Sequence, residues 1–113
     1  MAAEGDEHPA PKVRREAWVM WLKPGNEEIY KQKHDEIWPE LVDQIRAHGI
    51  SNYSIYRDGL TLFAYLERDG TAPLPEEPDP VTWRWWKMME PYMECNADGS
   101  PRRGEVEEMF HLE

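Results

Sequence analysis

Residues 51–67 have the sequence SNYSIYRDGLTLFAYLE, and this stretch decides the fold. Apolar and polar side chains alternate along Ser51–Arg57, the pattern of a half-buried β-strand. Asp58-Gly59 is a strong hairpin signal, because both central residues of a two-residue type I′ turn need a positive φ. Leu60–Glu67 then supplies the return strand. The centre of the chain is therefore predicted to be an antiparallel hairpin.

The residues before the hairpin predict one more strand and one long helix. Arg15–Lys23 (REAWVMWLK) is rich in aromatic and β-branched side chains and is followed by a proline-glycine pair, which favours a strand with a defined end. A helix is expected from Asn26, whose side-chain oxygen can cap it, to about His48, with Gly49 as its stop. Pro39 interrupts the hydrogen-bond ladder of this helix, so we expect a kink or a restart just before it.

The residues after the hairpin complete the fold. Arg68–Pro80 is proline-rich and is expected to be a surface loop, followed by a short helix over Thr82–Glu90 and a last strand over Val106–Leu112. The order β-α-β-β-α-β predicts an α+β domain of the ferredoxin-like, split β-α-β type, with an antiparallel sheet and both helices on one face. The other face would then need a cover, either a second copy of the chain or a ligand.

Length and charge limit the range of functions. The chain has 113 residues, which is one domain's worth; we expect a flexible tail over 1–14 and a single domain over 15–113. Asp and Glu number 23 against 13 Lys and Arg, and the resulting net charge of −10 argues against nucleic acid and anionic membranes as partners. The single cysteine, Cys95, cannot form an intramolecular disulfide, and this suits a reducing cytoplasm.

Two groups of residues could carry chemistry. His34 follows Tyr30 by one helical turn on the apolar stripe of the predicted helix, and imidazole is the side chain that exchanges protons near neutral pH. A histidine packed into the core is the more common explanation of such a pattern. Residues 83–86 (WRWW) place three indoles in different directions around a helix, so at least one should border a cleft or an interface. Tyr53 lies on the first hairpin strand, where tyrosine is also an ordinary sheet residue.

Several other site types have no sequence support. The chain contains no HExxH or CxxC pattern for a metal, no GxGxxG or P-loop pattern for a nucleotide, and no GxSxG elbow. His48 ends the predicted helix, where a histidine is explained by the helix dipole. No metal or cofactor is therefore expected.

A series of motifs in order along the chain resembles the L-rhamnose mutarotase family. The resemblance covers residues 15–113, and the motifs are YKQKH (30–34), IWPEL (37–41), HG (48–49), NYSIY (52–56), LFA (62–64), RWW (84–86) and MFHL (109–112). It implies a homodimeric ferredoxin-like fold of the dimeric α+β barrel type, without a cofactor, that interconverts the α and β anomers of a deoxy-sugar. It also implies His34 as the proton donor and four residues as sugar contacts, namely Tyr30, Tyr53, Trp85 and Trp86.

Anomer exchange fits the residues, because it needs only a proton for the ring oxygen and the loss of one from the anomeric hydroxyl. Stacked indoles can hold a nearly uncharged sugar without charged groups. The proline-rich stretch Arg68–Pro80 departs from the family, where a helix-forming stretch is common. This departure affects one wall of the expected cavity and hence the sugar preference.

Three alternatives remain at this stage. The enzyme could act on L-fucose or another 6-deoxy sugar instead of L-rhamnose. The same fold could be a non-catalytic, dimeric sugar-binding module. Ranked third is a cofactor-free oxygenase or a small-molecule lyase, since one fold can host several chemistries.

Overall fold

The computed structural model describes residues 12–113, so most of the expected tail over 1–14 lies outside the described residues. Residues 13 and 14 already belong to the first strand. The elements in chain order are β1 (Val13–Trp21), α1 (Glu27–Asp35), α2 (Pro39–Ala47), β2 (Ile50–Asp58), β3 (Thr61–Asp69), α3 (Pro80–Met89), the 3-10 helix η2 (Glu90–Tyr92) and β4 (Gly104–Glu105).

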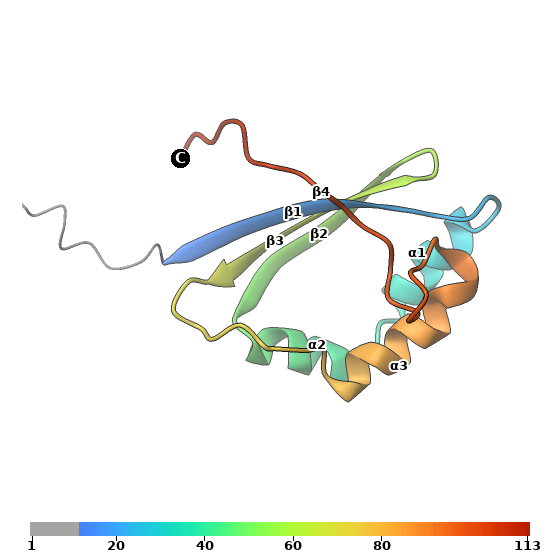
Figure 1. The fold of residues 1–113 in the computed structure, drawn as a ribbon, viewed down its shortest axis with the longest axis horizontal. Helices are drawn as coiled ribbons and strands as arrows, with labels where there is room; N and C mark the ends of the chain where they lie inside the picture. The colour runs from blue at the N-terminus through green and yellow to red at the C-terminus, as the bar shows by residue number, and fades with distance from the viewer. Residues whose placement is uncertain (1–11) are drawn as a thin grey trace, which may run out of the picture.

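The strands form one antiparallel sheet in the order β2-β3-β1-β4. β1 pairs with β3 over its whole length, from Val13 opposite Asp69 to Trp21 opposite Thr61. The three α-helices cover one face of this sheet and leave the other face without helices (Figure 1). This arrangement confirms the α+β, ferredoxin-like prediction.

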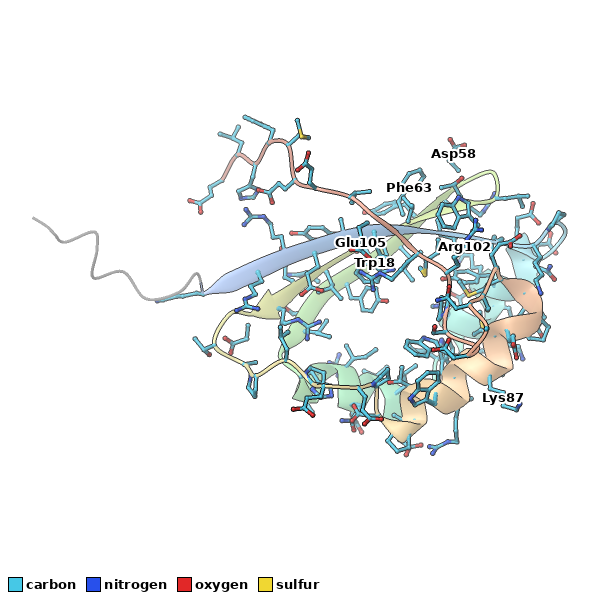
Figure 2. The ribbon with its side chains drawn as sticks, in the orientation of Figure 1. Trp18, Asp58, Phe63, Lys87, Arg102 and Glu105 are labelled. Atoms are coloured by element: carbon cyan, nitrogen blue, oxygen red, sulfur yellow. The ribbon has the colours of Figure 1, made fainter. Side chains whose placement is uncertain are left out.

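The core lies between the sheet and the helices. Alternate residues of β1 and β3, such as Trp18, Met20 and Leu62, are buried on the helix-covered face. Figure 2 shows Trp18 on this inner side of the sheet. The helices contribute Leu41, Trp85 and other buried side chains, so the apolar faces of both layers exclude water together.

The turn of the hairpin differs from the prediction by one residue. Asp58 pairs with Thr61, so the two turn residues are Gly59 and Leu60 rather than Asp58 and Gly59. Gly59 has φ +61°, and neither Asp58 nor Leu60 has a positive φ. A positive φ at the first turn residue alone is the pattern of a type II′ turn, in which glycine occupies that position.

The expected helix over 26–48 restarts at Pro39, as predicted. Trp38 has an extended backbone (φ −64°, ψ 130°), because the residue before a proline is disfavoured in the helical region. The expected cap at Asn26 has a different chemistry: its amide nitrogen donates to the carbonyl oxygens of Lys23 and Pro24, and its oxygen caps no helix N–H. Asn26 therefore closes the preceding turn instead. Gly49 has φ +77° and ends the helix pair as expected.

The predicted last strand over Val106–Leu112 is wrong. The only strand there is the two-residue β4, and residues 106–113 are exposed outside the sheet. All four apolar side chains in this segment are exposed, so it has no face that is buried against the rest of the fold (Val106, Met109, Phe110 and Leu112). The residue before β4 is held to the sheet by a cation–π contact, because the guanidinium of Arg103 lies 4.3 Å from the centre of the Trp18 ring.

Candidate active site

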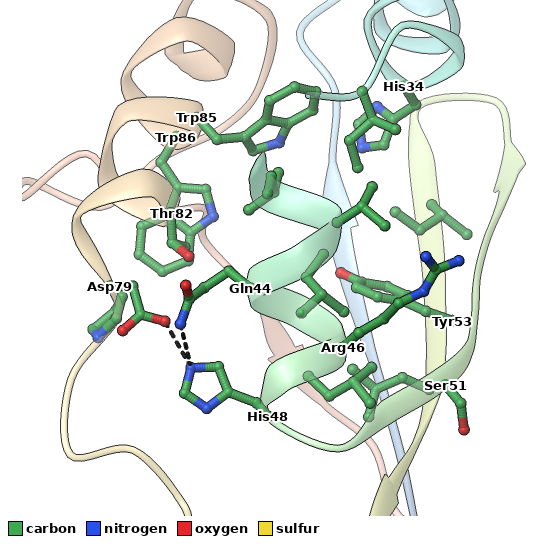
Figure 3. Close-up of a pocket in the computed structure, with 18 of the residues that line it drawn as sticks. His34, Gln44, Arg46, His48, Ser51, Tyr53, Asp79, Thr82, Trp85 and Trp86 are labelled. Atoms are coloured by element: carbon green, nitrogen blue, oxygen red, sulfur yellow. Dashed lines mark hydrogen bonds and ion pairs between the residues drawn. The ribbon is translucent and has the colours of Figure 1, made fainter. Parts of the chain in front are cut away.

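A cavity of about 940 Å³ lies between the helices and β2, and the five proposed site residues from the sequence line it. They come from three separate parts of the chain: α1, β2 and α3. Figure 3 shows His34 opposite Trp85 at one end of the cavity, with Tyr53 on the wall formed by β2. The residues concerned are Tyr30, His34, Tyr53, Trp85 and Trp86.

His34 is fixed in one orientation by its own helix. Its Nδ1 lies 3.0 Å from the carbonyl oxygen of Tyr30, one turn earlier in α1. A carbonyl oxygen can only accept a hydrogen bond, so Nδ1 must carry the proton. Nε2 of neutral His34 therefore has a free lone pair, and among residues 12–113 it has no hydrogen-bond partner. Burial lowers the pKa of His34 below its usual 6.5, so the neutral ring prevails at neutral pH.

Aromatic rings enclose this imidazole on two sides. The ring of Tyr30 lies over it at a centroid distance of 4.3 Å, and the ring of Trp85 lies perpendicular to it at 5.3 Å. Trp85 in turn meets Trp38 edge-on at 5.1 Å. The interlocked rings leave His34 little freedom to rotate.

Tyr53 reaches the cavity through a β-bulge. Between Ser51 and Ser54, β2 uses one residue more than β3, and Asn52 at the bulge has φ +49°. The amide nitrogen of Asn52 donates to Oε1 of Glu67 at 2.7 Å and anchors the bulge. Tyr53 is 40% exposed, since its ring borders the open cavity, whereas burial of its hydroxyl raises the pKa of Tyr53 to about 12.

The tryptophans of α3 divide their roles as the sequence suggested. Trp85 is buried and belongs to the core, whereas Trp86 is only half-buried and is packed against Trp83 at 5.0 Å. Trp86 thus presents an indole with open surface to the cavity (Figure 3). Burial also raises the pKa of Tyr30 well above its usual 10, so its hydroxyl stays protonated.

Sequence reasoning missed a polar pair at the other end of the cavity. His48 follows α2, and its Nε2 lies 2.6 Å from Oδ2 of Asp79, which immediately precedes α3. The helix dipole alone therefore does not account for His48. The only sequence signal was the HG motif, because the partners are 31 positions apart and nothing in the sequence between them links the two.

Two site types are not found in the described part of the chain. Within residues 12–113, no three His, Cys, Asp or Glu side chains lie close enough together to hold a metal ion. No helix of this range is long and apolar enough to cross a membrane.

Comparison with known proteins decides the family. The family model described as L-rhamnose mutarotase matches residues 15–112. The chain belongs to the L-rhamnose mutarotase family. The resemblance noted in the sequence is therefore confirmed.

Relatives in this family are similar over nearly their whole length. L-rhamnose mutarotase of Listeria monocytogenes is 42% identical over 103 residues, which is 88% of this chain and 99% of the relative. The protein of the same name from Bacillus subtilis is 41% identical over 104 residues, covering 89% of this chain and all of the relative. A crystal structure of L-rhamnose mutarotase from Formosa agariphila superposes with a TM-score of 0.81 at 35% identity, covering 88% of this chain and 99% of that one.

Proposed function

We propose that this chain is an L-rhamnose mutarotase, an isomerase that interconverts the α and β anomers of L-rhamnose. The observation that carries the proposal is His34, a neutral imidazole with a free Nε2 that faces an aromatic-walled cavity. The names of the relatives support the same substrate. The proposed catalytic unit is the single domain over 15–113.

His34 acts in two steps, first as a base and then as the proton donor. Nε2 takes the proton from the anomeric hydroxyl O1, the O1 electron pair forms the C1=O1 double bond, and the C1–O5 bond breaks. The imidazolium then gives the same proton to O5. The open-chain aldehyde rotates about C1–C2 and closes on its other face by the reverse sequence. One neutral imidazole can serve both directions, since it is regenerated at each closure.

The remaining proposed site residues hold the sugar. Trp86 stacks its half-buried indole on the C–H side of the ring, and Trp85 lies beside His34. The hydroxyls of Tyr30 and Tyr53 stay protonated and can donate hydrogen bonds to sugar oxygens. Pro75 also lines the cavity, and it belongs to the proline-rich segment that departs from the family pattern.

We also propose that the protein is a homodimer in the cytoplasm. The helix-free face of the sheet carries an apolar pair, Tyr56 and Phe63, which are 69% and 44% exposed. Large exposed apolar side chains on a sheet face favour a second copy as cover. The cytoplasmic setting is supported by the free thiol of Cys95.

Anomer exchange measured by NMR tests the function. We expect saturation of one anomeric proton of L-rhamnose to transfer to the other anomer faster with the protein than in buffer. L-fucose and other 6-deoxy sugars, tested at equal concentration, should exchange more slowly. Faster exchange of another sugar would reassign the substrate. Saturable quenching of tryptophan fluorescence by sugar with exchange at the buffer rate would instead identify a non-catalytic binding module.

A further inference from the structure

We propose that His48 and Asp79 form a positioning latch that sets the tryptophan wall of the cavity, and so determines how tightly the sugar is bound. This inference rests on the proposed function, because it assigns the latch to the same site. His48 and Asp79 are positioning residues rather than catalytic ones, since their side chains act on the site through α3.

The latch is a hydrogen bond that joins the end of α2 to the start of α3. His48 is the residue after α2, Asp79 is the residue before α3, and their side chains meet at 2.6 Å (Figure 3). Both side chains are half-buried, at 26% and 29% exposure, so water competes with this bond less than with a surface pair. The amide of Gln44, one turn before His48, lies 3.4 Å from the same ring nitrogen.

Asp79 bonds to His48 instead of capping the helix that it precedes. An aspartate before a helix normally accepts a hydrogen bond from the first turn, but the Asp79 side chain caps no N–H of α3. Its carboxylate accepts from His48 instead. The bond to His48 therefore replaces a capping contribution that the same residue could have made locally.

The latch fixes the N-terminal end of α3, about two turns before Trp86. Trp86 follows Asp79 by seven residues, which is about two helical turns, so the two residues share one side of α3. A shift of the start of α3 therefore moves the indole of Trp86 with it. The segment that enters α3, including Pro75 and Pro78, lines the same cavity and is held by the same anchor.

His34 is remote from the latch. α2 has nine residues, and at 1.5 Å per residue it separates the two ends of the cavity by about 13 Å. Loss of the latch should therefore weaken sugar binding and leave the proton transfer at Nε2 almost unchanged.

A second contact between the same helices provides a matched control. Arg84 of α3 lies 2.9 Å from Glu40 of α2, but these side chains are 55% and 68% exposed. An exposed ion pair contributes little. Glu40→Ala should thus leave binding and turnover unchanged, although it removes a bond between the same two helices.

The test is steady-state exchange kinetics on His48→Ala, Asp79→Ala and the double variant, each with tryptophan quenching by L-rhamnose as an independent measure of binding. We expect KM and the quenching Kd to rise about tenfold in each single variant, with kcat within about twofold of wild type. The double variant should be no worse than either single one, because both remove the same bond. His48→Gln, which retains a donor near the position of Nε2, should recover most of the affinity.

Three results would overturn the latch: unchanged KM and Kd, a fall in kcat as large as the rise in KM, or additive effects in the double variant. A loss of thermal stability without a change in affinity would reduce the pair to a structural role. If His48→Ala does not fold, Asp79→Leu decides the question, since leucine keeps the bulk of the aspartate side chain and removes its acceptor. If the wild type shows no anomer exchange, the proposed function fails, and quenching by sugar still measures the latch separately.

Discussion

The two faces of the sheet differ in what covers them. On the helix-covered face, side chains such as His34 and Trp85 are locked by ring contacts at 4.3 to 5.3 Å and line a cavity. On the opposite face, Tyr56 and Phe63 are exposed and have no helix above them. The comparison teaches that one sheet can border a helix-enclosed cavity on one side and carry an open apolar surface on the other.

The largest expected effect is the loss of activity when His34, on the helix-covered side, is replaced. We expect His34→Ala to remove the enzyme-dependent part of anomer exchange, by at least about 10²-fold, because alanine has no group that can take the proton from one sugar oxygen and give it to the other. Circular dichroism and the thermal unfolding midpoint should show a folded protein. Exchange in this variant at the wild-type rate would remove His34 from the mechanism.

The second prediction concerns the open face. Phe63→Asp places a charge in the proposed interface, so we expect sedimentation to show a monomer where the wild type is a dimer. Exchange per chain should remain within severalfold of wild type, since the cavity lies on the other face. Leu74→Asp is the control, because Leu74 is also exposed (55%) but lies outside the sheet. A wild type that is already monomeric contradicts the proposed dimer.

The hairpin and the helices show what a local pattern can predict. The restart at Pro39 was predictable because proline acts on its immediate neighbours. The turn was misplaced by one residue, because Gly59 satisfies the positive φ of a type II′ turn as well as that of a type I′ turn. The strand over Val106–Leu112 was wrong, because apolar content alone does not provide a strand with a face to bury.

Within the site, the residues could be predicted from the sequence more easily than the contacts between distant segments. Tyr30 and His34 share a helical stripe, and their proximity follows from helix geometry. The bulge at Asn52 and the contact of His48 with Asp79 depend on pairings between distant segments. Their geometry therefore became visible only once the chain was folded, although Asn52 is a residue type that tolerates positive φ.

A smaller effect is expected at the indole that faces the cavity. Trp86→Ala should raise KM for L-rhamnose about tenfold, because the sugar loses a stacking surface, with little change in kcat. Trp86→Phe should recover part of the loss. Equal falls in kcat and kcat/KM would show that Trp86 acts only in the transition state, contrary to the proposed binding role.

The smallest effect is expected at the bulge. Asn52→Gly keeps the positive φ but loses the bond to Glu67, so we expect KM to rise only two- to threefold, on the order of 0.5 kcal/mol. Asn52→Val, a β-branched residue disfavoured at this φ, should cost more in both thermal stability and affinity. Identical behaviour of the two variants would show that the bulge does not aim Tyr53.

The pH dependence of kcat/KM for anomer exchange tests the central claim most directly. Burial lowers the pKa of His34, and the neutral ring is the reactive form, so activity should be constant from pH 7 to 8.5 and fall only as the pH drops through a value below 6.5. His34 acting first as an imidazolium donor predicts the opposite, with activity decreasing about tenfold per unit as the pH rises above its pKa. A decline on the alkaline side of pH 7 would contradict the account.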